Sequence, residues 1–166
     1  MEEVILVNEK DEQIGLMEKM EAHRKGVLHR AFSVLIFNTK GELLLQRRAL
    51  HKYHSPGLWT NTCCSHPRNG ESIKDAAKRR LREEMGMSCD LEVKGSFIYK
   101  TGLEGGLTEH EFDYVLTGIS NDLPVINLEE VSEFKYMRPE DLKIAMDEHP
   151  ESYTFWIREM NNRNLL

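Results

Sequence analysis

The chain has 166 residues, 40% hydrophobic and 30% charged, which is an ordinary balance for a soluble protein and fits one domain over residues 1–166. No apolar run approaches the ~18–20 residues of a membrane span, and the acidic N-terminus does not resemble a secretory signal. The net charge of −6 disfavours nucleic acid as a partner, so we expect a cytoplasmic protein that binds neither nucleic acid nor membrane.

The apolar pattern predicts six strands in chain order. They are expected at Val4–Val7, Ala31–Phe37, Glu42–Arg48, Leu91–Lys100, Glu111–Gly118 and Glu133–Arg138. The second and third should form a hairpin through the turn NTKG, and the fourth and fifth should be joined by the glycine-rich turn TGLEGG. Between these hairpins, Pro56-Gly57 breaks the chain into a loop.

Three helices are predicted between and after the strands. Ser72 should cap the first, which ends at Gly86 and carries an apolar stripe at every fourth residue: Ile73, Ala77, Leu81 and Met85. Two more are expected at 139–148 and 153–162. Because strands and helices mix without a strict βαβ rhythm, we predict an α/β or α+β sandwich, a mixed β-sheet flanked by helices.

Histidine and carboxylate residues form one candidate site. Glu109 and Glu111 bracket His110, and positions two apart on a strand share a face, so the two carboxylates can converge while His110 points away. The histidines that could join them are His23, His29 and His66. Three imidazoles and two carboxylates suit a divalent ion such as Zn²⁺ or Mn²⁺. Most of the seven histidines in a chain such as this need not be ligands, so spacing alone does not decide the matter.

Three cysteines are present, at positions 63, 64 and 89. Their odd number and the adjacency of two of them argue against a disulfide framework. Adjacent residues on an extended segment point to opposite faces, so one of Cys63 and Cys64 can face a cavity while the other packs. A small buried hydrophobe is the simpler interpretation of each cysteine.

The predicted helix resembles the back half of a Nudix box, G-x5-E-x7-R-E-U-x-E-E-x-G-U, where U is aliphatic. The matching residues are Glu71, Arg79, Glu83, Glu84 and Gly86. Ser65 replaces the opening glycine, and Arg80 replaces a glutamate that holds Mg²⁺ in Nudix hydrolases. Because Arg80 and Glu84 are four residues apart, they lie on the same ridge of the helix. The alternative interpretation is a surface helix stabilised by salt bridges.

The segment RRALHKYHSPGLWTNTCCSHP, residues 47–67, carries a more specific resemblance. Its motifs R-R-A-L, P-G-x-W-T-N and C-x-H-P are the signature of the type I isopentenyl diphosphate isomerases, a diverged Nudix family whose box also has arginine for glutamate. The resemblance runs from about Val4 to Trp156. It implies a Nudix fold and the interconversion of isopentenyl and dimethylallyl diphosphate in isoprenoid biosynthesis.

The resemblance also implies roles for individual residues. Cys64, not Cys63, matches the catalytic cysteine of C-x-H-P, and the other catalytic residues are Glu111, Tyr99 and Trp156. The implied metal ligands are His23, His29, His66, Glu109 and Glu111, with Glu84 for a Mg²⁺ bound together with the diphosphate. The implied diphosphate contacts are Lys19, Arg48, Lys52 and Arg80. The cofactors are then Mg²⁺ and a second divalent ion, Zn²⁺ or Mn²⁺.

The chemistry explains these residue types. A proton added to an unactivated alkene makes a tertiary carbocation, so an acid and a base are needed at its two ends, and Cys64 and Glu111 can supply them. Because a free thiol has a pKa near ~8.5, a neighbouring positive charge would help Cys64 to hold a thiolate. The face of Trp156 can stabilise the carbocation by about 1–2 kcal/mol. Arg80 suits a protein that binds a diphosphate without cleaving it.

Two other functions compete with the isomerase. A Nudix pyrophosphohydrolase acting on a nucleoside diphosphate derivative would keep its glutamate cluster, which Arg80 interrupts. A metal-stabilised binding protein would keep the histidines and carboxylates but would not need Cys64 and Tyr99. For the isomerase the partner is a small allylic or homoallylic diphosphate, and the protein is expected to be a monomer or a small homo-oligomer.

Overall fold

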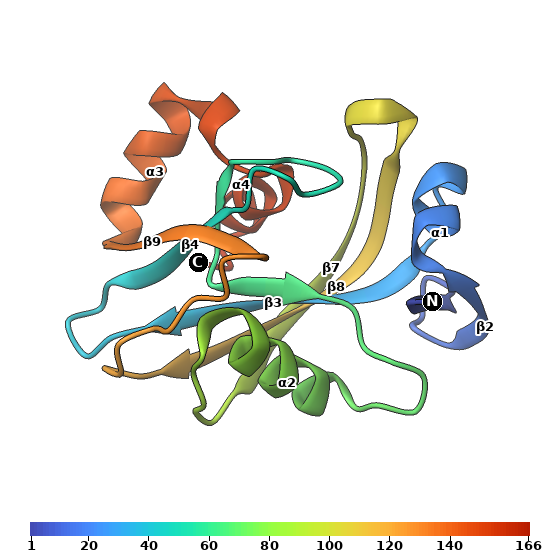
Figure 1. Cartoon of the computed structure of the whole chain (residues 1–166), viewed down its shortest axis with the longest axis horizontal. Coiled ribbons are helices and arrows are strands. Elements are labelled where there is room, and N and C mark those ends of the chain that lie inside the picture. Colours follow the sequence, from blue (N-terminus) through green and yellow to red (C-terminus); the bar gives the residue numbers. More distant parts are fainter.

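The computed structural model describes all 166 residues. A mixed nine-stranded sheet lies at its centre, with helices on both faces (Figure 1). The strands are β1 Glu3–Val7, β2 Gln13–Glu18, β3 His29–Phe37, β4 Leu43–Arg48, β5 Trp59–Thr60, β6 Cys63–Ser65, β7 Glu92–Gly102, β8 Thr108–Ile119 and β9 Val131–Met137. The helices are α1 Lys19–Lys25, α2 Ile73–Met85, α3 Pro139–Glu148 and α4 Phe155–Asn162, with short 3-10 turns at Glu104–Gly106 and Pro150–Ser152. The predicted fold class is confirmed.

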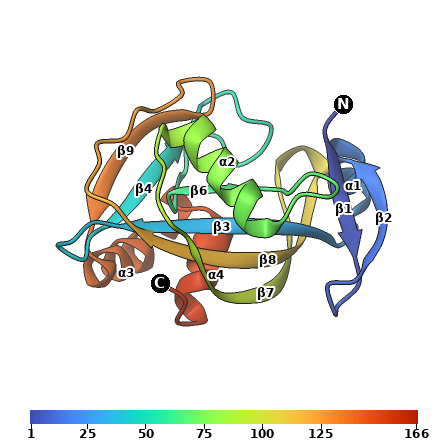
Figure 2. The same ribbon diagram turned by 90° about the horizontal axis from the view of Figure 1, so that it is seen from below.

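The long strand β3 separates the two layers of the core (Figure 2). Phe32, Val34 and Ile36 point to the face covered by α2, whereas Leu35 points to the face covered by α3 and α4. Alternation along a strand therefore places His29, six residues before Leu35, on the α4 face as well. No helix combines the length and apolar character that crossing a bilayer requires.

The strand β8 runs parallel to β3 and brings two distant parts of the chain together. Its register places Glu111 opposite His29 and Val115 opposite Ser33. Since Val115 packs in the α4-side core, Glu111, four residues earlier, lies on that face too. The parallel pairing therefore sets a histidine and a carboxylate side by side on one face of the sheet.

The predicted hairpin between β3 and β4 forms only next to its turn, where Phe37 pairs with Leu43. Beyond that pair the prediction is wrong, because β4 pairs along its length with β9 and β3 pairs with β6. Thr62 explains the separation of the two strands. Its Oγ1 accepts from the backbone N–H of Ile36 at 2.9 Å and donates to the carbonyl of Leu44 at 2.6 Å. The segment before β6 is thus wedged between β3 and β4.

The helix α2 confirms the predicted helix in position and in its ends. The Ser72 hydroxyl accepts a hydrogen bond from the backbone N–H of Asp75 at 3.1 Å, and Gly86 ends the helix with φ +62°. This left-handed conformation favours glycine, which has no Cβ. Ala77, Leu81 and Met85 are fully buried, so the predicted stripe faces the sheet. The opposite side of α2 is left free for charged residues.

The strand β2 and the helix α1 were not predicted. They precede β3: β2 pairs with β1, and α1 lies beside the β7–β8 hairpin (Figures 1 and 2). The Glu18 carboxylate caps α1 by accepting hydrogen bonds from the N–H groups of Met20 and Glu21. The helix ends at Gly26, whose φ is +67°. Its seven residues make about two turns and place His23, which is fully buried, against the sheet.

Candidate active site

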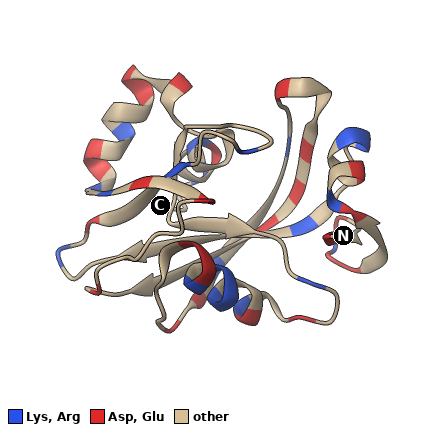
Figure 3. Cartoon of the chain, viewed as in Figure 1, with Lys and Arg blue, Asp and Glu red and all other residues tan.

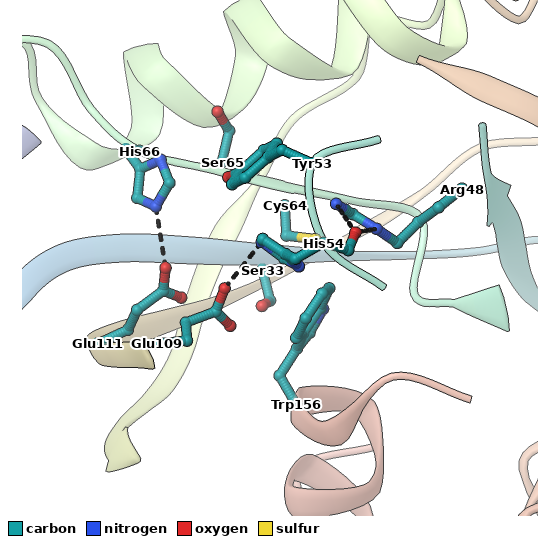
Figure 4. Close-up of a pocket in the computed structure, with 10 residues that line it drawn as sticks. All are labelled: Ser33, Arg48, Tyr53, His54, Cys64, Ser65, His66, Glu109, Glu111 and Trp156. Carbon is teal, nitrogen blue, oxygen red and sulfur yellow. Dashed lines mark hydrogen bonds and ion pairs between the residues drawn. The ribbon is translucent and has the colours of Figure 1, made fainter. Parts of the chain in front are cut away.

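A pocket opens on the α4 face of the sheet, where β3, β6, β8, α4 and the loop after β4 meet (Figure 4). Its cavity volume is about 40 Å³, and charged, polar and aromatic side chains line it. Among its lining residues are Cys64, Glu109, Glu111 and Trp156, which the sequence placed in the site. Parts of the chain that are far apart in sequence therefore converge on one cavity.

The three predicted histidine ligands gather beside this pocket. His23 comes from α1, His29 begins β3, and His66 follows β6. Their ligand atoms and one carboxylate oxygen of Glu111 all lie within 4.8 Å of one another. All four residues are buried, and His23 and His29 have no exposed surface. Glu109 belongs to an adjoining group with His23, so all five predicted ligands are brought together.

Hydrogen bonds at Nδ1 fix the tautomers of two of these histidines. Nδ1 of His23 lies 2.7 Å from the carbonyl of Lys19, and Nδ1 of His29 lies 2.9 Å from the carbonyl of Val27. A carbonyl oxygen only accepts, so each Nδ1 carries the proton and each Nε2 presents a lone pair. Nε2 of His23 is buried without a hydrogen-bond partner, and Nε2 of His29 faces Glu111 Oε2 at 3.2 Å. Lone pairs that converge on a carboxylate fit a divalent metal ion.

The two glutamates of β8 point into the site together, as predicted, while His110 faces away and contacts the carbonyl of Gly26. Tyr99 lies opposite Glu111 on β7. The Tyr99 hydroxyl donates to Oε1 of Glu111 at 2.7 Å and makes a short contact with Glu109. Because burial raises the pKa of Tyr99 well above its ordinary value, this group stays a hydroxyl donor.

The charge of Glu111 is set by competing effects. Burial alone would raise the pKa of its carboxyl group. When Nε2 of His29 and of His66 carries a proton in place of a metal ion, their contacts with Oε2 at 3.2 and 2.9 Å outweigh burial and hold that pKa well below the ordinary value. The carboxylate is therefore ionised in this arrangement and can accept a proton.

The adjacent cysteines point to opposite faces of the sheet, as predicted for an extended segment. Cys63 is buried in the α2-side core, whereas Cys64 lines the pocket. Burial raises the pKa of the Cys64 thiol well above its ordinary value, and the nearby Arg48 lowers it only in part. Arg48 supplies the positive charge that we expected beside Cys64. Desolvation has the larger effect on the pKa of Cys64, however, and favours the protonated thiol.

A second cavity adjoins the first and gathers the predicted diphosphate-binding residues. All four of them, Lys19, Arg48, Lys52 and Arg80, line it together with Glu84. Carboxylates contact three of these cations: Glu2 contacts Lys19 at 2.8 Å, Glu130 contacts Lys52 at 2.6 Å, and Glu84 contacts Arg80 at 2.9 Å. Both acidic and basic residues lie along α2 in Figure 3. Four of the 22 Lys and Arg residues of this acidic chain thus meet in one cavity.

Two buried residues of the site were missed. His54 lies in the loop after β4, and its Nε2 is 3.1 Å from Oε2 of Glu109. Asp113 follows Glu111 by two positions on β8. Both of its oxygens lie within hydrogen-bond distance of the Ser33 hydroxyl, at 3.1 and 2.9 Å, and burial is the main cause that raises its pKa well above the ordinary value. The alternation of acidic residues along β8 was a readable signal for Asp113, but nothing local indicated His54.

Comparison with known proteins identifies related chains. The NUDIX domain family matches residues 27–157. An isopentenyl-diphosphate Delta-isomerase of Pectobacterium atrosepticum is 50% identical over 156 residues, which cover 94% of this chain and 87% of the relative. Isopentenyl-diphosphate Delta-isomerase 2 of Photorhabdus laumondii is 48% identical over 163 residues, covering 98% and 92%. The similarity therefore extends over nearly the whole length of both chains.

Solved structures agree on the fold. The crystal structure of a Deinococcus radiodurans protein superimposes with a TM-score of 0.81 at 23% identity and covers 98% of each chain. At that identity the likeness concerns the architecture alone.

Proposed function

The chain belongs to the type I isopentenyl-diphosphate Delta-isomerases of the Nudix superfamily, and we propose that Cys64 and Glu111 move the protons in its reaction. That reaction interconverts isopentenyl and dimethylallyl diphosphate. One proton is added to the alkene at one carbon and another is removed two bonds away, so an acid and a base must reach the same small molecule. The observation that carries the proposal is that both side chains line one pocket.

The two groups differ in protonation in the way that a proton shift requires. Burial raises the pKa of the Cys64 thiol, whereas His29 and His66 overcome burial and lower that of Glu111. The pocket therefore offers one proton donor and one proton acceptor. When the thiol gives its proton to carbon and the carboxylate takes one from carbon, the two groups exchange states. The reverse reaction starts from the exchanged states, so both directions use both groups.

Tyr99 and Trp156 support these transfers. The Tyr99 hydroxyl donates to Oε1 of Glu111 and so orients the carboxylate at the pocket. Trp156 is 3% exposed and lines the cavity, where its face can stabilise a carbocation by about 1–2 kcal/mol. Burial of the pocket also keeps water from capturing that cation.

The second cavity is proposed to hold the diphosphate. Lys19, Arg48, Lys52 and Arg80 offer donors suited to phosphate oxygens, and the guanidinium groups can bind them through paired N–H groups. Arg48 lines both cavities, and its guanidinium carbon lies 5.4 Å from the centre of the Trp156 ring. This residue therefore links the diphosphate end of the substrate to the alkene end.

Two kinds of metal ion complete the proposal. His23, His29, His66, Glu109 and Glu111 would hold Zn²⁺ or Mn²⁺, and Glu84 would hold Mg²⁺ together with the diphosphate. An ion bound to Glu111 would make its protonated carboxyl group a stronger acid. We also propose a cytoplasmic location, which the three free cysteines support, because reducing compartments keep thiols unpaired.

A direct assay tests the activity. Purified protein is incubated with isopentenyl diphosphate, Mg²⁺ and either Zn²⁺ or Mn²⁺ in D₂O, and the products are followed by NMR. We expect dimethylallyl diphosphate carrying deuterium from solvent, with no release of phosphate. Release of phosphate without isomerisation would indicate a pyrophosphohydrolase and contradict the proposal.

A further inference from the structure

His54 is a buried histidine in the loop between β4 and β5, and it contacts both halves of the pocket (Figure 4). Its Nε2 lies 3.1 Å from Oε2 of Glu109. Its ring packs at 87° against Trp156, with the ring centres 5.7 Å apart. His54 therefore lies between the proposed metal cluster and the aromatic wall of the alkene pocket.

The surroundings of its two ring nitrogens indicate where the proton lies. A carboxylate oxygen only accepts, so Nε2 carries hydrogen and donates to Glu109. Nδ1 lies 3.2 Å from the Ser55 hydroxyl, which can donate to the lone pair that remains. A neutral ring in this tautomer satisfies both nitrogens.

His54 stands apart from the compact ligand group. The ligand atoms of His23, His29, His66 and Glu111 lie within 4.8 Å of one another, whereas His54 forms such a group only with His23 and Glu109. A nitrogen that donates its N–H to a carboxylate has no lone pair left for an ion. The other oxygen of Glu109 is contacted by the Tyr99 hydroxyl. Both oxygens of Glu109 are therefore contacted, and His54 supplies the N–H donor at Oε2, because the single hydroxyl hydrogen of Tyr99 is donated to Glu111.

We propose that His54 is a positioning residue, which holds the Glu109 carboxylate in the orientation that binds the divalent ion. The inference rests on the proposed role of Glu109 as a metal ligand. Carboxylates that bind metal ions are themselves held by hydrogen bonds, and loss of such a partner weakens metal binding by roughly 10–100-fold. The backbone carbonyl of His54 accepts from Arg48 Nε and Nη2 at 3.3 and 3.0 Å, so a change of the side chain leaves that contact in place.

Three variants separate this role from its alternatives. His54→Ala removes the donor, and His54→Gln keeps an N–H donor on a side chain of similar reach. His51→Ala is the control, because it removes an exposed histidine from the same loop. Each metal-free protein is titrated with Zn²⁺ against a competing chelator in the absence of substrate, and its melting temperature is recorded to establish that it folds. The values of kcat and KM for isopentenyl diphosphate are then measured with saturating Mg²⁺ and with a Zn²⁺ concentration that fills the parent site but not a tenfold weaker one.

We expect His54→Ala to bind Zn²⁺ roughly 10–100-fold more weakly, with His54→Gln and His51→Ala close to the parent. Because Arg48 keeps its contact, kcat should fall in His54→Ala while KM stays unchanged. Parent-like Zn²⁺ affinity in His54→Ala would overturn the inference. An equal loss in His54→Ala and His54→Gln would also overturn it, since the imidazole would then be a direct ligand. Parent-like affinity in Glu109→Gln would instead overturn the metal site itself, so the two failures are distinguishable.

Discussion

Arg80 and Glu84 face each other across one turn of α2, with Nη2 of the guanidinium 2.9 Å from Oε2 of the carboxylate. In a Nudix hydrolase both positions would carry glutamate and bind a metal ion. A guanidinium cannot coordinate a cation, but it can bind phosphate oxygens. Under the proposed function, the exchange of one side chain would convert part of a metal site into part of an anion site.

We therefore predict that Arg80→Ala raises the KM for isopentenyl diphosphate at least tenfold, or about 1.4 kcal/mol, because a phosphate contact is lost. Arg80→Glu should raise it further, since a carboxylate then faces the diphosphate, and should not produce efficient hydrolysis. Arg82→Ala removes an exposed guanidinium from the same helix and should leave KM unchanged. Steady-state kinetics check all three. An unchanged KM in Arg80→Ala would leave Arg80 as a structural partner of Glu84 only.

The two adjacent cysteines make a matched pair for testing the catalytic thiol. Cys64→Ala should nearly abolish isomerisation without unfolding the protein, because Cys64 lines the pocket. Cys63→Ala should keep most of the activity and lose only some stability, because Cys63 is buried in the opposite core. Isomerisation rates and thermal melts of both variants decide the assignment. An inactive Cys63→Ala beside an active Cys64→Ala would reverse it.

Glu111→Gln should also nearly abolish isomerisation, because an amide neither delivers nor accepts the required proton. Tyr99→Phe should lower kcat less severely, since it removes only the hydroxyl that donates to Glu111 and keeps the ring against Phe97 and Phe155. The rates are compared at saturating metal, so that weaker metal binding does not mask the result. Full activity in Glu111→Gln is incompatible with its proposed role.

Removal of metal should abolish activity reversibly. The buried lone pairs of His23 and His29 and the carboxylate of Glu111 indicate a site for a divalent ion. Treatment with a strong chelator should inactivate the protein, and Mg²⁺ together with Zn²⁺ or Mn²⁺ should restore it. Mg²⁺ alone should restore less, because nitrogen ligands favour the transition metals. Full activity in chelator without added metal would refute the requirement.

A pH-dependent contribution to stability is expected from the contact between Glu71 and Arg79. Arg79 Nε and Nη2 donate to the carboxylate at 2.8 and 2.9 Å, and this pairing lowers the pKa of Glu71 from 4.5. Because the folded pKa lies below the unfolded one, the contribution is present above pH 4.5 and is lost as pH falls through the folded value. Glu71→Gln should therefore be less stable than the parent at neutral pH but not in acid. Urea unfolding at several pH values measures this, and a difference that persists in acid would contradict it.

The sequence predicted the parts of the site that depend on local pattern. The two-residue spacing of Glu109 and Glu111 predicted that their side chains point to the same face of the sheet. The adjacency of Cys63 and Cys64 predicted that their side chains point to opposite faces. Family motifs then supplied partners that no local rule could bring together, such as His23 and Trp156. The close approach of these residues is decided by long-range strand pairing, which a local pattern does not contain.

Short elements with weak local signals were missed. The strand Gln13–Glu18 is mostly exposed and has little apolar alternation, and α1 has seven residues with a glutamate as its cap. The strands β5 and β6 have only two and three residues, and they are defined by their pairing with neighbouring strands. His54 was missed for a related reason, because the loop that carries it gives no sign of the carboxylate it meets. Only the folded loop reveals that contact.

The pairing of β3 with β8 has a consequence for how the chain reaches its native state. His29 meets Glu111 only when these strands, far apart in sequence, align in one register. A slip of one residue would turn Glu111 to the other face of the sheet and dismantle the cluster. A metal ion that binds only the correctly aligned strands stabilises that alignment by mass action. An ion held by this cluster would thus act as a template that favours the right strand partners while the chain folds.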